Sequence, residues 1–305
     1  MKSVSIVIVN WNAGKLLQEC VESVLEYAEA LVEQIIVIDN ASSDNSIDLL
    51  PSSKLITIIQ NKTNRGFGAA CNQGYRASMA DYVLLLNPDA RLLQGSLQKC
   101  VDFMEANKKF AVLGVKHIDE SNQVQPSCSR YPSFAGFITL SLGLHQIAPK
   151  FFKSPILMLE FDYEKPGEVD QVMGAFMFIR RSVIGKLNTF MDERFFVYYD
   201  DLDFSKRISL SGEVSFYNPD ITIYHKGNGT TDSVRDLRIF YSLQSRLRYI
   251  KKYFGGLQVV ILSFVSLCIE PVARITQLIL QRRSTEVREV LKGYYLLYRS
   301  LLRNG

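Results

Sequence analysis

The stretch VSIVIVNWN, residues 4–12, decides the fold, because a continuous apolar run of strand length leads directly into short polar side chains. Runs without apolar-polar alternation are typical of parallel strands that helices cover on both faces. No small-residue cleavage site follows, so we interpret the run as a β-strand and not as a signal peptide. Similar runs recur at residues 35–38, 55–59, 82–86 and 111–115.

Helical periods lie between these runs. Apolar residues at spacings of three and four mark a helix over residues 16–28, and further helices are expected over 68–77 and 97–104. This alternating order predicts an α/β fold with a doubly wound, mostly parallel sheet and right-handed crossovers.

Three polar clusters follow strand ends, where ligands of such sheets bind. They are Asn10-Trp11-Asn12, residues 39–44, and Asn87-Pro88-Asp89. We therefore expect them to form one site. Within the second cluster, Ser43 or Asp44 is expected to cap a helix that starts before Ile47.

Composition limits the class of protein. The 305 residues are 47% hydrophobic and 22% charged, which excludes a disordered or low-complexity chain. Five scattered cysteines without a CxxC pair argue against a disulfide framework or a cysteine zinc site. The pattern favours a reducing, cytoplasmic location.

Charge is distributed unevenly. Residues 235–305 hold 13 Lys and Arg against 4 Asp and Glu, whereas the first 234 residues hold 22 against 27. A basic tail suggests a polyanionic partner, but Gly256–Leu280 is too apolar for a nucleic-acid arm. Glu270-Pro271 and Arg274 interrupt it as a membrane span. We predict an interfacial pair of helices on an anionic membrane; the alternative is a core helix packed on the body.

The glycine-rich stretch NRGFGAAC, residues 64–71, resembles a dinucleotide-binding loop only at its start and follows the wrong strand. The sequence also lacks the GxxxxGK[ST] phosphate loop. A site without a glycine cradle can instead neutralise a diphosphate through a divalent metal held by a carboxylate at a strand end.

The motifs, taken in order, resemble those of family-two inverting glycosyltransferases of the GT-A fold, in particular a bacterial rhamnosyltransferase-like branch. The similar segments cover about residues 1–235: IVIVNWNA, VIDNASSDNS, NRGFGAACNQG, LLLNPDA, VMGAFMFIRR, FFVYYDDLDF and YHKGNGT. The resemblance implies a transferase domain over 1–235, with a nucleotide-binding half of about 1–115 and an acceptor-binding half of about 116–235. Residues 236–305 then form a helical, membrane-associating C-terminal region.

On the donor side, the resemblance places the first loop around the nucleoside and gives Asp39 a contact to base or ribose. The loop asparagines could equally cap the first helix. Arg65 is expected at the pyrophosphate or base, because a guanidinium suits those acceptors. The expected nucleotide-binding residues are Asn10, Trp11, Asn12, Asp39, Asn40, Arg65 and Asn87.

Asn87-Pro88-Asp89 replaces the family's DxD motif, with an amide in the first position. Asp89 can supply one oxygen ligand to Mg²⁺ or Mn²⁺. The resemblance adds His225, placed before the glycine-rich residues 227–229, as a metal or phosphate contact. Lys226 would add positive charge at the diphosphate. His117 and His145 are interpreted as structural.

The segment YYDDLD, residues 198–203, follows apolar residues, so its acids are expected to be partly buried, with raised pKa values. Asp201 aligns with the family's catalytic base, and Asp200 replaces the usual glutamate. Asp200 and Asp203 are expected to contact the acceptor. Gly174-Ala175 resembles the acceptor-side loop, where a small residue lets the backbone approach a sugar.

The sequence therefore predicts transfer of a sugar, rhamnose from dTDP-rhamnose by resemblance, to a polyprenyl-linked glycan in cell-surface polysaccharide synthesis. The same chemistry with a UDP-hexose or UDP-galactofuranose stays open. So do a nucleotidyltransferase, which would want a basic glycine-rich loop after the first strand, and a non-catalytic sugar-nucleotide-binding protein. The expected partners are a nucleoside diphosphate sugar, a glycan acceptor and the inner face of the cell membrane, without nucleic acid.

Overall fold

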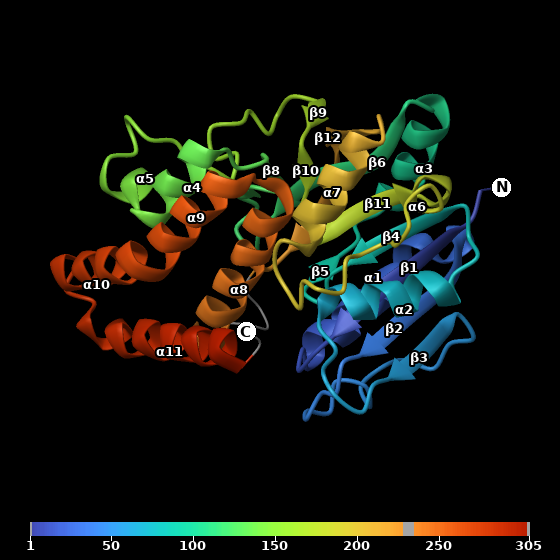
Figure 1. The fold of residues 1–305 in the computed structure, drawn as a ribbon. Helices are drawn as coiled ribbons and strands as arrows, with labels where there is room; N and C mark the ends of the chain where they lie inside the picture. Colours follow the sequence, from blue (N-terminus) through green and yellow to red (C-terminus); the bar gives the residue numbers. More distant parts are fainter. Residues whose placement is uncertain (1, 228–234, 304–305) are drawn as a thin grey trace. The chain divides into compact units, whose positions relative to one another are not determined.

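The computed structural model describes residues 2–227 and 235–303 (Figure 1). The predicted strands are present as β1 (Val4–Asn10), β2 (Val32–Asp39), β3 (Ile56–Gln60), β4 (Tyr82–Leu86) and β6 (Phe110–Ile118). The predicted helices between them are α1 (Lys15–Ala28), α2 (Phe67–Ala77) and α3 (Ser96–Ala106). The sequence prediction of these elements is confirmed.

The strands join in one mixed sheet with the order β3-β2-β1-β4-β11-β6-β12-β5. Pairs β1·β2, β2·β3, β1·β4 and β6·β12 are parallel, whereas β11 pairs antiparallel with both β4 and β6. The mostly parallel α/β fold is confirmed. The later strands are β5 (Ala90–Arg91), β11 (Phe176–Arg180) and β12 (Val214–His225), with β7 (Val124–Gln125) and β9 (Gly167–Val169) at the side; β8 (Cys128–Ser129) and β10 (Gln171–Val172) form a separate pair.

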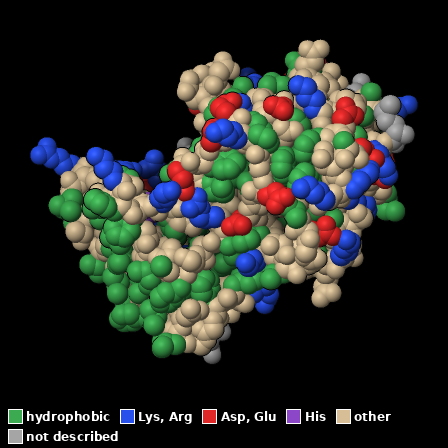
Figure 2. All heavy atoms as spheres, turned by 90° about the horizontal axis from the view of Figure 1, so that it is seen from above, with side chains coloured by type: hydrophobic (Ala, Val, Ile, Leu, Met, Phe, Trp, Pro, Cys, Tyr) green, Lys and Arg blue, Asp and Glu red, His purple; other side chains and the backbone are tan. Residues whose placement is uncertain are grey.

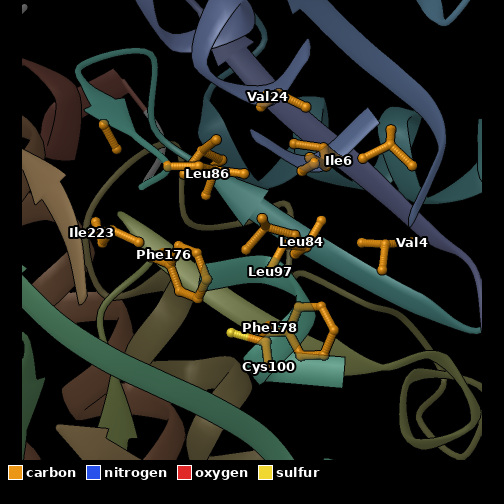
Figure 3. Close-up of a cluster of buried hydrophobic side chains, with 14 of the residues drawn as sticks. Val4, Ile6, Val24, Leu84, Leu86, Leu97, Cys100, Phe176, Phe178 and Ile223 are labelled. Carbon is orange, nitrogen blue, oxygen red and sulfur yellow. The ribbon is translucent and has the colours of Figure 1, made fainter. Parts of the chain in front are cut away.

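Helices α1 and α3 cover one face of the sheet, and α2 packs on the other. Figure 3 shows the first contact, where side chains of β1, β4 and β11 meet those of α1 and α3. On the other face, a Cβ added at Gly74 of α2 would lie 2.3 Å from Val7 of β1. Apolar burial on both faces explains why the strand sequences lack alternation.

The chain divides into two compact units. The first comprises Met1–Ser129, Phe161–Phe196 and Asp200–Thr230, and the second Arg130–Glu160, Val197–Tyr199 and Thr231–Gly305. No sequence signal indicated that residues 130–160 and 197–199 belong with the C-terminal helices. The remaining helices are α4 (Phe134–Ser141), α5 (Leu144–Ile147), α6 (Arg181–Ile184), α7 (Asp200–Leu210), α8 (Arg235–Tyr253), α9 (Gly256–Phe264), α10 (Glu270–Leu280) and α11 (Val287–Arg303).

Gly256–Leu280 forms one continuous helix and not the interrupted pair that the sequence suggested. A π-helical turn, Val265–Ile269, joins α9 to α10, and Pro271 lies at the start of α10. A wide turn leaves backbone groups unpaired, so the missing N–H of a proline there does not break the helix. The helix is long and apolar enough to cross a membrane, and 22% of its most apolar window is buried.

Candidate active site

The ends of β1 and β2 meet through Asn10 and Asp39, which are also register partners. Asn10 Nδ2 donates to Asp39 Oδ1 at 2.8 Å and lies 2.8 Å from Ser46 Oγ. Asn10 is fully buried and Asp39 is 5% exposed. The structure therefore brings these two predicted nucleotide residues together and orients the Asp39 carboxylate from within the fold.

Asn12 joins the same two loops and does not cap α1. Its Oδ1 accepts from the Ser43 backbone N–H at 2.7 Å, and its own N–H donates to Ser42 Oγ at 3.0 Å. Its φ of 53° is left-handed, a conformation that asparagine tolerates well. Trp11, between the two asparagines, is half-buried.

The prediction of a helix that starts before Ile47 is wrong, because bends and turns occupy residues 43–49. Asp44 instead supports the loop before α1. Its carboxylate accepts from the Gly14 N–H at 2.9 Å and from the Ser46 hydroxyl at 2.6 Å. Turn formation through side chain to backbone bonds competes directly with helix initiation.

Asn40 and Arg65 belong to one loop network. Asn40 is 2% exposed and accepts from the Arg65 backbone N–H at 3.0 Å, while its Nδ2 donates to Asn64 Oδ1 at 2.9 Å. The Arg65 side chain is half-exposed and lies 4.0 Å from Glu193 Oε2. Asn40 thus shapes the loop, and Arg65 keeps a solvent-accessible guanidinium on it.

Asp89 and His225, which the sequence predicts as metal ligands, lie together where β5 pairs with β12, and we call this place the predicted metal corner. β12 pairs with β5, so His225 lies opposite Ala90, and His225 Nε2 is 3.4 Å from Asp89 Oδ1. The Lys226 N–H donates to the Asp89 carbonyl at 3.0 Å, and the Lys226 side chain is exposed. Residues 228 and 229 of the expected glycine-rich loop lie outside the described residues.

The buried His117 ring packs against the ring of His225. Its ring centroid is 5.3 Å from that of His225, and its buried Nε2 has no hydrogen-bond partner. Burial lowers the pKa of His117 to about 3, so the ring is neutral at physiological pH. Within residues 2–227 and 235–303, His, Cys, Asp and Glu form no group of three suited to a metal.

The turn that carries Asn87 links the metal corner to the acceptor loop. The Asn87 N–H donates to the Ala175 carbonyl at 3.0 Å, and the Asn87 carbonyl accepts from Ala90 at 3.0 Å. Ala175 is 6% exposed. A Cβ at Gly174 would meet Asp201 and Phe67 at ordinary contact distances, 3.6–3.7 Å, so a small residue keeps this surface open toward Asp201.

Asp201 lies at the start of α7, where two backbone N–H groups orient its carboxylate. Its Oδ2 accepts from the Gly174 N–H at 3.1 Å and its Oδ1 from the Leu202 N–H at 2.8 Å. The side chain is only partly buried. Burial raises the pKa of Asp201, although these hydrogen bonds oppose the rise.

Asp200 and Asp203 have different surroundings. Asp200 is 3% exposed, and its Oδ2 has no partner; burial, and then the charge of Asp201, raise the pKa of Asp200 well above the ordinary value. Asp203 is fully buried and bonds Arg207 Nε at 2.8 Å. That ion pair gives Asp203 a structural role, and the acceptor contact expected of both residues stays a prediction.

The sequence did not indicate that Asn72 and two glycines of residues 64–71 pack against the segment before the acidic cluster. Asn72 is 3% exposed and makes both backbone bonds to Met191, at 2.8 and 2.9 Å. A Cβ at Gly66 would lie 2.3 Å from the Phe196 carbonyl, to which Phe67 N–H donates at 2.7 Å. A Cβ at Gly68 would lie 3.3 Å from Met191 Cβ. This motif therefore docks the segment that leads into the acidic cluster.

A cavity of about 480 Å³ lies elsewhere in the first unit. Its charged groups already have partners: Lys2 lies 2.6 Å from Asp81, Arg180 lies 3.7 Å from Glu105, and Arg181 donates to Ser78 Oγ at 3.1 Å. Paired charges leave little to attract a diphosphate, so the strand-end residues remain the better candidate site.

The fold is that of a GT-A glycosyltransferase. The model of the family Glycosyl transferase family 2 matches residues 5–187, and the chain belongs to this family. The resemblance inferred from the motifs is thereby confirmed.

Two curated relatives are rhamnosyltransferases. The N-acetylglucosaminyl-diphospho-decaprenol L-rhamnosyltransferase of Mycobacterium tuberculosis is 26% identical over 245 residues, covering 74% of this chain and 76% of the relative. Rhamnosyltransferase WbbL of Escherichia coli is 26% identical over 186 residues, covering 60% and 67%. The chain is a glycosyltransferase related to these enzymes.

Solved structures support the fold. The mannosyltransferase PcManGT of Pyrobaculum calidifontis, in complex with GDP-Man and Mn²⁺, superposes with a TM-score of 0.55 at 13% identity, covering 97% of this chain and 87% of that one. Residues 1–349 of TarS from S. aureus give a TM-score of 0.51 at 13% identity, covering 98% and 91%. At such identities the likeness shows the fold alone.

Proposed function

We propose that this chain transfers a sugar from a nucleoside diphosphate to a hydroxyl of a polyprenyl-linked glycan and inverts the anomeric centre. One observation carries the proposal: within a family-two fold, the half-buried Asp201 carboxylate is held by the Gly174 N–H, while Asp89 and His225 pair separately at 3.4 Å. This arrangement offers one carboxylate to an acceptor and another to a leaving group.

The donor binds in the half of about residues 1–115. The buried Asn10–Asp39 pair presents its carboxylate to the nucleoside, with Trp11 and Asn12 beside it. Asn40 holds the loop from which the Arg65 guanidinium reaches the pyrophosphate. Asn87 and Lys226 lie at the sugar and diphosphate.

The donor set at Asp89 and His225 suits Mn²⁺ or Mg²⁺, because it combines one hard carboxylate with one imidazole. A bound metal would neutralise the charge of the departing diphosphate. The Mn²⁺ named with the PcManGT structure supports this assignment.

Asp201 acts as the general base. The acceptor hydroxyl attacks the anomeric carbon from the face opposite the diphosphate, and Asp201 accepts its proton as the new bond forms. The Gly174 N–H fixes the carboxylate at 3.1 Å, so one oxygen is oriented before the acceptor binds. Asp200 and Asp203 support the acceptor side in the half of about residues 116–235.

We propose dTDP-rhamnose as the donor and a polyprenyl-diphosphate glycan as the acceptor. The names of the two rhamnosyltransferase relatives support this choice. Enzyme and acceptor would meet at the inner face of the cell membrane during polysaccharide synthesis. Residues 236–305 would bind that membrane, because the helix Gly256–Leu280 is apolar and basic residues flank it.

Calorimetric titration with dTDP and UDP, each with and without Mn²⁺, tests donor and metal together. We expect dTDP to bind in the presence of Mn²⁺, and Asp89→Asn to weaken that binding. Lys62→Gln, at an exposed loop position, is the control. Binding of UDP with none of dTDP would instead favour a UDP-hexose or UDP-galactofuranose. Full transfer in excess EDTA would contradict metal dependence.

A further inference from the structure

The segment Ile147–Leu159, between α5 and β9, exposes a run of large apolar side chains. Phe151 is 85% exposed, and Ile147 and Leu159 are 63% and 58% exposed. Phe152 and Leu157 are also exposed. Single exposed apolar residues are normal at a protein surface, but several on one loop indicate a binding surface.

The charges on this loop have one sign. Lys150 and Lys153 flank the two phenylalanines, and both lysines are exposed. From Arg130 to Leu159 the sequence contains no Asp or Glu. The loop thus combines exposed aromatic rings with adjacent cations, the pairing that suits an anionic bilayer surface.

The elements before this loop pack against the apolar helix Gly256–Leu280 within the second unit. Gln277 Nε2 donates to the Leu142 carbonyl at 3.0 Å. Gly143 makes room for this side chain, since a Cβ there would lie 2.0 Å from Gln277 Nε2. Two segments distant in sequence therefore pack together within this unit. Figure 2 shows a broad area of hydrophobic side chains with Lys and Arg at its border, on the side where Figure 1 places α5, α9 and α10.

The long helix itself has two different faces. Its exposed face carries Leu257, Val260, Phe264, Val272 and Ile279, which are 74%, 65%, 58%, 63% and 59% exposed. On the opposite face, Glu270 is fully buried and pairs with Arg246 of α8 and with Arg274. A helix with one face packed on charged partners lies along a membrane surface more readily than it crosses the bilayer.

We propose that Lys150-Phe151-Phe152-Lys153 is a second membrane-binding element, which inserts its phenylalanines into an anionic bilayer beside the helix Gly256–Leu280. This inference extends the membrane association proposed above and does not depend on the identity of the donor. A second copy of this chain is a poorer occupant, because it would bring the same positive charge to the loop. An anionic lipid surface matches both the apolar rings and the lysines.

Site-specific tryptophan fluorescence tests the inference, because Trp11 is the single tryptophan of the chain. The full chain carries Trp11→Phe together with Phe151→Trp. The control carries Trp11→Phe with Met79→Trp, since Met79 is 77% exposed in the first unit. The probes are phosphatidylcholine vesicles with and without phosphatidylglycerol, and the same vesicles with brominated acyl chains.

We expect the emission of the reporter at position 151 to shift to the blue and to be quenched by brominated chains on anionic vesicles. The control reporter should do neither. In the otherwise native chain, Phe151→Ser with Phe152→Ser should lower the partition coefficient onto anionic vesicles by about tenfold or more.

An unchanged spectrum at position 151, while the chain still sediments with vesicles, would contradict insertion of residues 150–153. The helix Gly256–Leu280 would then be the membrane contact. A blue shift that needs higher protein concentration and no vesicles would identify a second copy as the occupant and also overturn the proposal. Nucleotide binding by the serine variant, measured in parallel, separates these results from a failure of the proposed transferase activity.

Discussion

Asp200, Asp201 and Asp203 are near neighbours in the sequence, but each carboxylate has a different environment. Asp200 is buried with one oxygen unpartnered, Asp203 is paired with Arg207, and Asp201 is half-buried with two backbone N–H donors. A base must be accessible to the acceptor and able to hold a proton at working pH. Asp201 meets both conditions.

Replacing Asp201 with Asn should lower kcat by about 10²–10⁴ and leave nucleotide binding unchanged, because the amide cannot accept the proton of the hydroxyl. Steady-state transfer assays and nucleotide titration measure the two effects separately. If Asp201→Asn stays active and Asp200→Asn is inactive, the base is the neighbouring residue. If all three Asn variants stay active, the general-base mechanism is wrong.

The pH profile gives an independent check on the same residue. Burial raises the pKa of Asp201 above that of an ordinary carboxyl group, about 4. The base works only when it is ionised, so kcat/KM should fall as the pH is lowered through this raised pKa. We expect the acid limb of the wild-type profile above pH 4 and its absence from the residual rate of Asp201→Asn.

At the scale of elements, helix α2 positions the chain that leads to α7. Asn72 and Gly66 bind Met191 and Phe196 through backbone hydrogen bonds and close approach. Tyr198 and Tyr199 then adopt φ values of 64° and 63°, an uncommon conformation for bulky residues. Residues 197–199 and Ser245 belong to the second unit, and Ser245 Oγ holds the start of this turn by donating to the Val197 carbonyl at 2.8 Å.

Gly66 and Gly95 each precede a helix with a positive φ, 86° and 74°, but only Gly95 is left-handed with a ψ of −1°, whereas the ψ of 165° at Gly66 is essentially reserved for glycine. A Cβ at Gly95 meets nothing within 4 Å, whereas one at Gly66 meets a backbone carbonyl at 2.3 Å. Gly95→Ala should cost about 1–2 kcal/mol of left-handed strain. Gly66→Ala should cost about 1–3 kcal/mol more, because its backbone conformation is less accessible to alanine and the methyl group meets the Phe196 carbonyl, and it should also lower turnover.

Urea unfolding gives the two free energies, and the transfer assay gives the two rates. Equal destabilisation by both substitutions would mean that neither the backbone at Gly66 nor the Phe196 carbonyl resists the added methyl group. In that case α2 would not fix the position of the acidic cluster.

At the scale of the whole molecule, the charge excess of the tail should make membrane binding sensitive to salt. Residues 235–305 hold 13 Lys and Arg against 4 Asp and Glu, and each cation near an anionic surface contributes about 1 kcal/mol. We expect sedimentation with phosphatidylglycerol vesicles to weaken markedly between about 0.05 and 0.5 M salt, as screening lengths shorten. Equal binding to neutral vesicles at both salt concentrations would contradict an electrostatic contribution.

The sequence by itself determined the parallel strands, their helices and the family. Apolar runs and spacings of three and four are local patterns, and each strand length is set within a few residues. Asn10, Asp39 and Asp89 were also predictable as strand-end residues, because a parallel sheet brings its carboxyl ends to one edge.

Only the tertiary structure decided which polar groups meet and which are engaged in hydrogen bonds or ion pairs with other parts of the chain. The family resemblance already paired Asp89 with His225, but the Asn72–Met191 bonds join residues far apart in the chain, and the Asp44 carboxylate that was expected to cap a helix instead accepts from Gly14. Likewise, Glu270 interrupts an apolar sequence, yet it turns inward to Arg246 and leaves the helix continuous. Local patterns cannot anticipate these pairings, because burial and hydrogen bonding are properties of neighbours that only folding supplies.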